Sequence, residues 1–154
     1  STVSVGAITL AQINANIDVV ELEVLEGEEE RVIPTVGEWE GGFNVLLVGV
    51  DNAPNQTVAG GRTATLNDVN ILVHVAEDQQ SAVAVSIPRD MVIPIPSCPD
   101  PDGEGASFAM SAQPINVAWS YGGLNCVVLT VEALTGLSIP YAGAISFDGV
   151  AQLA

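Results

Sequence analysis

Runs of apolar residues predict several strands in the first two thirds of the chain. Residues 43–50 form a continuous apolar run, which is typical of a strand buried on both faces, as in a parallel sheet covered by helices. Residues 68–75 and 81–87 are the next strand candidates, and the short polar turn between them predicts an antiparallel hairpin. Residues 52–67 are rich in Gly, Asn and Thr, so we expect a loop there.

Later in the chain the apolar positions favour helix. Residues 116–121 have helical character, and residues 124–134 form a better helix that Gly136 would end. Residues 139–147 predict a further strand, and residues 148–154 the start of another helix. The pattern therefore predicts a mixed α/β fold in which helices flank a central mixed sheet.

Composition narrows the class of protein. The 154 residues suit one domain, and with 48% hydrophobic and 14% charged residues the chain is not a disordered acidic tail. Three arginines and no lysine stand against nineteen acidic residues, a net charge of −16, which argues against nucleic acid and anionic membrane surfaces as partners. The sequence has no uninterrupted apolar run of about 18 residues and no basic region of the kind that begins a signal peptide.

The two cysteines, Cys98 and Cys126, lie far apart and form no CxxC motif, which argues against a zinc site. In an exported protein they would pair as a disulfide, and closing that ring would contribute about 3–4 kcal/mol. In a cytosolic protein they would be two buried thiols.

Arg89 ends the stretch Val85-Ser-Ile-Pro-Arg-Asp90, at the polar exit of an apolar strand. A cation at this position in so acidic a chain favours a site for anions, with phosphate the first candidate. The alternative is a turn that ends the strand and carries a solvated ion pair.

Asp51 follows one predicted strand and Asp68 begins another. If these strands are antiparallel neighbours, both carboxylates lie at the same edge of the sheet, where Arg89 could join them. Two carboxylates with water and phosphate oxygens would suit Mg²⁺. Alternatively, each aspartate caps a turn.

Five blocks in order along the chain resemble the LytR-CpsA-Psr (LCP) family of bacterial cell-wall enzymes. Each block is weak alone, but their order is specific, and the resemblance covers about residues 43–154. The blocks are Asn44-Val-Leu-Leu-Val-Gly-Val-Asp51, Asn67-Asp-Val-Asn-Ile-Leu-Val-His74, Ser86-Ile-Pro-Arg-Asp90, Ile115-Asn-Val-Ala-Trp-Ser-Tyr-Gly-Gly123 and Thr130-Val-Glu-Ala-Leu-Thr-Gly-Leu137.

The resemblance implies an LCP-like fold and a phosphotransferase that acts outside the cell membrane. Such an enzyme moves a glycopolymer from a polyprenyl-pyrophosphate carrier to peptidoglycan through a phosphodiester. By position, Asp51 and Asp68 resemble the family's Mg²⁺-binding aspartates, and Arg89 resembles its pyrophosphate-binding arginine. Asp90 would orient Arg89 or activate the acceptor hydroxyl. The prenyl tail would need an apolar tunnel, with the helix near Trp119 and Leu129 as one wall unless these residues simply pack in a core.

The chain departs from the family pattern in two ways. Many members carry an arginine two places before the second aspartate, where this chain has Leu66, and Arg62 could bind the pyrophosphate in its place. Members also continue beyond the point that corresponds to Ala154. We therefore expect residues 1–42 to be a spacer that follows a membrane anchor, and residues 43–154 to be the N-terminal portion of an LCP-like catalytic domain, truncated at its C-terminus. Such a chain alone would have weak activity or none.

A second function from another class is open. The same scaffold could form a non-catalytic extracellular domain that binds polyprenyl phosphate or wall glycan, or a structural component of a surface assembly. The absence of the family's further arginines and the strong acidity favour this alternative.

Overall fold

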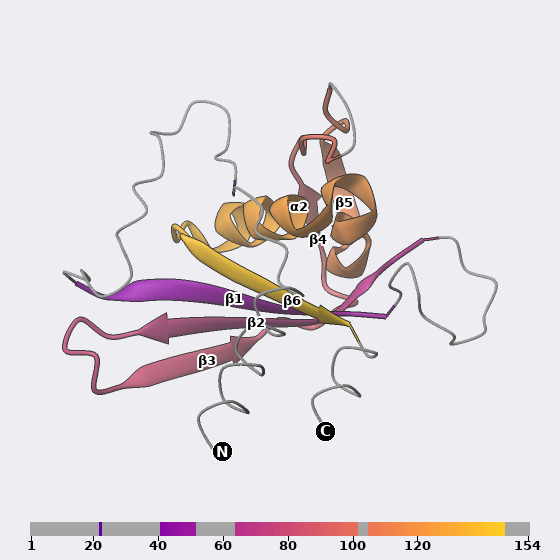
Figure 1. Cartoon of the computed structure of the whole chain (residues 1–154). Helices are drawn as coiled ribbons and strands as arrows, with labels where there is room; N and C mark the ends of the chain where they lie inside the picture. Colours follow the sequence, from indigo (N-terminus) through magenta and orange to yellow (C-terminus); the bar gives the residue numbers. More distant parts are fainter. Residues whose placement is uncertain (1–21, 23–40, 52–63, 102–104, 147–154) are drawn as a thin grey trace, which may run out of the picture.

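The computed structural model describes residue 22 and residues 41–51, 64–101 and 105–146. Within these ranges the chain forms two sheets and one long helix (Figure 1). In chain order the elements are β1 (Phe43–Val50), β2 (Asn67–Val75), β3 (Ala82–Ser86), β4 (Val92–Ile95), β5 (Met110–Pro114), the short 3₁₀ helix η1 (Ile115–Val117), α2 (Ala118–Thr135) and β6 (Tyr141–Ser146).

The larger sheet has the strand order β3-β2-β1-β6. Strand β1 is antiparallel to β2, with Phe43 opposite Val75 and Val48 opposite Asn70. Strands β2 and β3 form the antiparallel hairpin that the sequence predicted, and β6 joins β1 in parallel. The sheet is therefore mixed, and α2 lies on one of its faces (Figure 1). The predicted α/β class is confirmed.

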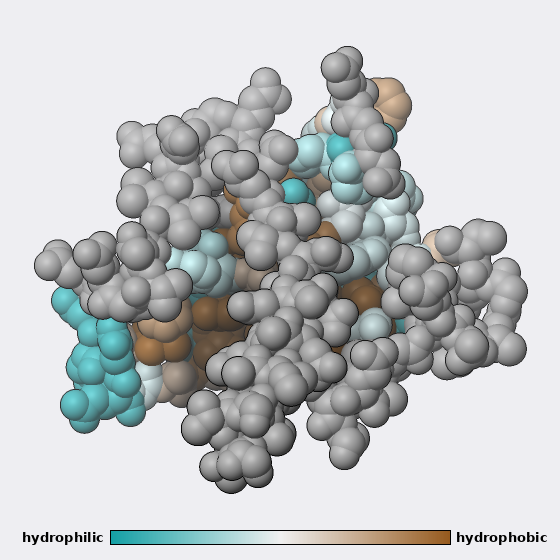
Figure 2. Space-filling model, viewed as in Figure 1, coloured by the Kyte–Doolittle hydropathy of each residue, from teal (hydrophilic) through white to brown (hydrophobic). Residues whose placement is uncertain are grey.

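The prediction that β1 is buried on both faces is wrong. Leu46, Val48 and Val50 are buried on the side of α2, whereas Leu47, on the opposite face, is 46% exposed. The reason is that α2 is the only helix of ordinary length in the described part of the chain, and it covers one face. The space-filling view shows apolar residues over the strands and a hydrophilic surface at the turn between β2 and β3 (Figure 2).

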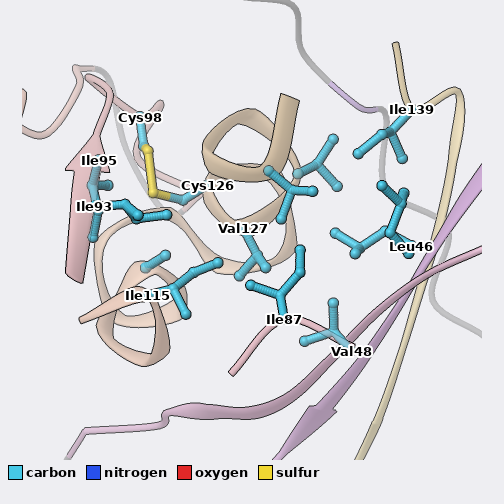
Figure 3. Packing of buried hydrophobic residues seen from close by; sticks show 14 of the residues in the cluster. Leu46, Val48, Ile87, Ile93, Ile95, Cys98, Ile115, Cys126, Val127 and Ile139 are labelled. Atoms are coloured by element: carbon cyan, nitrogen blue, oxygen red, sulfur yellow. A yellow bond between two sulfur atoms is a disulfide. The ribbon is translucent and has the colours of Figure 1, made fainter. Parts of the chain in front are cut away.

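The second sheet, β4 and β5, was not predicted. Its strands pair antiparallel through only a few residues, and β4 includes Pro94, which lacks the amide hydrogen that a regular ladder uses. Ile93 and Ile95 alternate with exposed neighbours and point towards α2 (Figure 3).

Helix α2 was predicted as two helical segments. The structure runs them together but breaks the helix geometry at Gly122 and Gly123, and ends it at Gly136 in a left-handed conformation with φ 69°. By length and composition alone, the segment Ile115–Thr135 could span a membrane, with a mean hydropathy of 1.3. Half of its most apolar window is buried in this fold, and its buried apolar side chains belong to the hydrophobic core.

The hydrophobic core lies on both sides of α2. Figure 3 shows Leu46, Val48 and Ile139 on one side of the helix, and Ile93 and Ile95 of β4 on the other. One helix thus serves two sheets, and each sheet covers a different part of its surface.

A disulfide joins Cys98, which follows β4, to Cys126 in α2 (Figure 3). This is the pairing expected for an exported protein. Both half-cystines are fully buried, and their Cα atoms lie 5.2 Å apart. The predicted spacer, residues 1–42, is described only at Leu22, Gly41 and Gly42, and the predicted loop, residues 52–67, only at residues 64–67. The predicted helix at residues 148–154 lies outside the described residues.

Candidate functional site

The end of β1 and the start of β2 bring Asp51 and Asp68 to the same end of the larger sheet. The strands are antiparallel neighbours, and Val50 lies opposite Asn67. The amide of Asp51 donates to the carbonyl of Leu66 at 3.2 Å, and the amide of Leu66 donates to Asp51 Oδ1 at 2.9 Å. Asp51 therefore caps a turn, as the alternative interpretation of this residue predicted. It also lies at the candidate site.

Arg89 reaches this same end of the sheet. Its Nη1 lies 2.9 Å from Asp68 Oδ1, and its Nε lies 3.6 Å from Asp90 Oδ2. The hydrogen bond to Asp68 and the charges of Asp68 and Asp90 raise the pKa of Arg89 above its ordinary value. The guanidinium is therefore a permanent cation, and with a side chain 53% exposed it is open to a ligand.

Backbone hydrogen bonds hold the segment that carries Arg89. The amide of Ile87 donates to the carbonyl of Asn70 at 2.8 Å, just after β3 ends. The carbonyl of Arg89 accepts from the amide of Asn116 in η1 at 3.1 Å. The arginine is thus fixed between the start of β2 and the helical segment that leads into α2.

Two buried asparagines, which no sequence pattern singled out, lie beside these charged residues. Asn67 Nδ2 donates to Asn70 Oδ1 at 2.8 Å, and Asn67 Oδ1 accepts from the amide of Trp119 at 3.1 Å. Asn67 therefore ties the start of β2 to the first turn of α2. Asn70 Nδ2 is buried without a hydrogen-bond partner within the described part of the chain. No signal distinguishes such asparagines from the loop residues that precede them, because Asn is favoured in turns.

The donor set at this end fits the chemistry of Mg²⁺ when a substrate supplies further ligands. Within the described residues there is no group of three or more His, Cys, Asp or Glu side chains that could enclose a metal ion. Mg²⁺ commonly takes one or two carboxylates and completes its shell with water and phosphate oxygens. The carboxylates of Asp51 and Asp68 are therefore ligands of the type that Mg²⁺ uses.

The other predicted site residues are Asp90, Arg62, Leu129 and Trp119. Asp90 is the most solvent-exposed of the charged side chains here, at 77%. Arg62 lies outside the described residues. Leu129 is buried, and Trp119 is partly buried and packs against the core.

Comparison with known proteins places the chain in a family. A sequence model of the LytR_cpsA_psr family matches residues 9–154. The polyisoprenyl-teichoic acid–peptidoglycan teichoic acid transferase TagT of Bacillus subtilis is 29% identical over 143 residues, which are 90% of this chain and 39% of that protein.

Solved structures share the fold. The protein gbs0355 from Streptococcus agalactiae has a TM-score of 0.55 at 25% identity, over 73% of this chain and 36% of that one. The family protein YwtF (TagT), solved with bound octaprenyl pyrophosphate lipid, has a TM-score of 0.54 at 24% identity, over 84% of this chain and 44% of that one.

Fold and sequence together identify a mixed α/β scaffold that these proteins share. The chain belongs to the LytR_cpsA_psr family. It spans about two fifths of the length of the curated relative that it matches.

Proposed function

We propose that this chain is part of an enzyme that transfers a glycopolymer from a polyprenyl-pyrophosphate carrier to peptidoglycan. The observation that carries the proposal is the contact of 2.9 Å between Arg89 and Asp68, at the end of the sheet where Asp51 also lies, in a chain of this family. TagT, the relative at 29% identity, is named for teichoic acid transfer to peptidoglycan.

In the proposed reaction a hydroxyl oxygen of the acceptor glycan attacks the phosphorus that bears the glycopolymer. The bond from that phosphorus to the bridging oxygen breaks, polyprenyl phosphate leaves, and a phosphodiester joins glycopolymer to acceptor. The hydroxyl proton passes to a base. Charge accumulates on the phosphoryl oxygens during the transfer, so preorganised cations lower the barrier.

We assign binding of the pyrophosphate to Arg89, whose guanidinium presents several N–H donors to phosphate oxygens. Asp68 would keep Arg89 in place and, with Asp51, would hold Mg²⁺, which when bound neutralises phosphoryl oxygens. Asp90, beside Nε of Arg89, would orient the guanidinium or accept the proton of the hydroxyl. The proposed location is the outer side of the cell membrane, which agrees with the disulfide because such bonds persist in oxidising compartments.

The test uses the full-length protein with Mg²⁺ and a pyrophosphate-linked lipid glycan, and it measures transfer and release of lipid phosphate. Arg89→Ala should lower the rate by about 10²–10³, as expected for loss of one preorganised donor to the transition state. Arg89→Lys is the matched variant, because it keeps the charge but loses the planar fork, and should retain an intermediate rate.

Because Arg89 is largely exposed, neither variant should shift the midpoint of thermal unfolding. Undiminished transfer by Arg89→Ala would exclude the role given to this residue. A protein that binds the lipid but produces no transfer with Mg²⁺ present would favour the non-catalytic alternative.

A further inference from the structure

A pocket of about 740 Å³ lies where the start of α2 meets two other segments. Residues 64 and 65, just before β2, form one wall, and the segment that follows the disulfide at Cys98 forms another. A pocket of this size is within the range of small-molecule sites, about 300–1,000 Å³. Its polar side chains and aromatic residues are Thr65, Asp100, Ser107, Trp119, Ser120 and Tyr121.

The lining residues indicate the kind of ligand. They combine hydroxyls, a carboxylate and two aromatic residues, and the described lining contains no Lys, Arg or His. Among these described lining residues, a phosphate or another anion would find no positive side chain. A neutral sugar suits the set, because its C–H face can lie on an aromatic ring while its hydroxyls donate to carboxylate and carbonyl oxygens.

Hydrogen bonds and the disulfide fix the walls. Ser120 Oγ donates to the carbonyl of Thr65 at 2.7 Å, which joins the start of α2 to the segment before β2. Across the other wall, the amide of Ser107 donates to the carbonyl of Cys98 at 2.8 Å, and the amide of Cys98 donates to Ser107 Oγ at 3.1 Å. Since these contacts are made within the chain itself, binding would cost little ordering of the walls.

The break in α2, at Gly122 and Gly123, lies in the wall of the same pocket. A Cβ atom on Gly122 would lie 2.8 Å from the carbonyl oxygen of Pro99 and 2.9 Å from Cβ of Cys98. Only glycine therefore lets the turn of α2 approach the disulfide this closely. The residue before this contact, Tyr121, lines the pocket and is 40% exposed.

We propose that this pocket binds a sugar residue of the glycan strand that accepts the phosphodiester. This rests on the proposed transferase function. Thr65 in the pocket wall is separated from Asp68 only by Leu66 and Asn67, so their Cα atoms lie at most about 10–11 Å apart. Asn67 also ties β2 to the amide of Trp119, so the pocket and the charged end of the sheet share one rigid frame.

The probe is chitotetraose, the β-1,4-linked tetramer of N-acetylglucosamine, titrated into the full-length protein by calorimetry. Tyr121→Ala should weaken its binding roughly five- to tenfold, the factor expected for one aromatic contact. The matched control is Phe108→Ala, since this neighbouring aromatic is 92% exposed and does not line the pocket. It should bind the probe as the unaltered protein does. Asp100→Asn should also weaken binding, because the amide accepts hydrogen bonds less strongly than a carboxylate.

A second titration, with geranylgeranyl pyrophosphate, separates this proposal from the transferase function. Tyr121→Ala should bind this lipid unchanged. Lipid binding without any chitotetraose binding, or equal chitotetraose binding by Tyr121→Ala and unaltered protein, would overturn the pocket assignment and leave the transferase proposal standing. Chitotetraose binding that depends on Tyr121 in a protein that does not bind the lipid would support a sugar site and contradict the transferase proposal.

Discussion

The two sheets of this molecule are held together in different ways. Strands β1 and β2 pair over their whole length, from Phe43 opposite Val75 to Val50 opposite Asn67, and hydrophobic side chains cover the face next to α2. Strands β4 and β5 pair through a few residues only. The smaller sheet is joined to α2 by the covalent bond between Cys98 and Cys126 as well as by packing.

The comparison shows how a covalent link can take the place of extensive pairing. A short two-stranded sheet is at most marginally stable alone, and the disulfide removes much of the entropy that the segment would otherwise gain on opening. The larger sheet positions Asp51, Asp68 and Arg89, while the segment beside the smaller sheet shapes the pocket. Disturbing one sheet should therefore leave the other largely formed.

Removal of the disulfide should have the largest effect. The double variant Cys98→Ser, Cys126→Ser is expected to lower the free energy of unfolding by about 3–4 kcal/mol, the chain-entropy estimate for a ring of this size. Urea denaturation measures the loss, and hydrogen exchange should show that β4 and β5 amides lose protection before those of β1 and β2. Equal loss of protection in both sheets would contradict the comparison.

Ser97→Ala serves as the control for that experiment. Ser97 Oγ donates to the carbonyl of Ser107 at 2.7 Å across the same loop, so this variant removes one exposed hydrogen bond and keeps the covalent link. We expect a loss of about 0.5–1.5 kcal/mol.

Asn67→Ala should have the next largest effect, because it removes a buried side-chain link between β2 and α2. The substitution leaves the amide of Trp119 and the side chain of Asn70 without their partner, at a cost of about 1–3 kcal/mol for buried polar groups. The control is Asn44→Ala, which also removes two side-chain hydrogen bonds, but exposed ones: Asn44 Nδ2 donates to the carbonyl of Ser138, and Asn44 Oδ1 pairs with His74 Nδ1. A loss in Asn67→Ala no greater than in this control would show that the buried asparagine has no special structural role.

Two conservative substitutions give the smallest effect and the sharpest comparison. Ile95→Val in the smaller sheet and Ile139→Val beside the larger one each remove one buried methylene, at about 0.5–1.5 kcal/mol. In the oxidised protein the two losses should be similar. After reduction of the disulfide, the loss from Ile95→Val should shrink because the smaller sheet is already open, while that from Ile139→Val should persist. An unchanged loss from Ile95→Val in the reduced protein would show that the smaller sheet does not depend on the disulfide.

The sequence predicted the larger sheet because its strands are long apolar runs with a clear turn between β2 and β3. The prediction that Asp51 and Asp68 lie at the same end of the sheet then followed, because antiparallel neighbours bring the end of one strand to the start of the next. The helix and its end at Gly136 could also be predicted, because helical patterning and a terminal glycine are local signals in the sequence.

The rest depends on contacts between residues far apart in the chain. Strand β4 is short and includes Pro94, and it packs against a helix more than twenty residues further along the chain. The role of Asn67 depends on Trp119, 52 positions away, and nothing local identifies it as buried. The pocket likewise exists only once three distant segments meet.

The placement of β1 between β2 and β6 has a consequence for biosynthesis. Its partner β2 follows soon in the sequence, but β6 is made only after the whole of α2. Until Tyr141–Ser146 leaves the ribosome, one edge of an apolar strand has unpaired amides and carbonyls, which is the kind of edge that invites pairing with another chain. Among the described strands of this sheet, β6 is thus the last to be synthesised and the one that covers this edge of β1, so interrupted synthesis should yield aggregation-prone products.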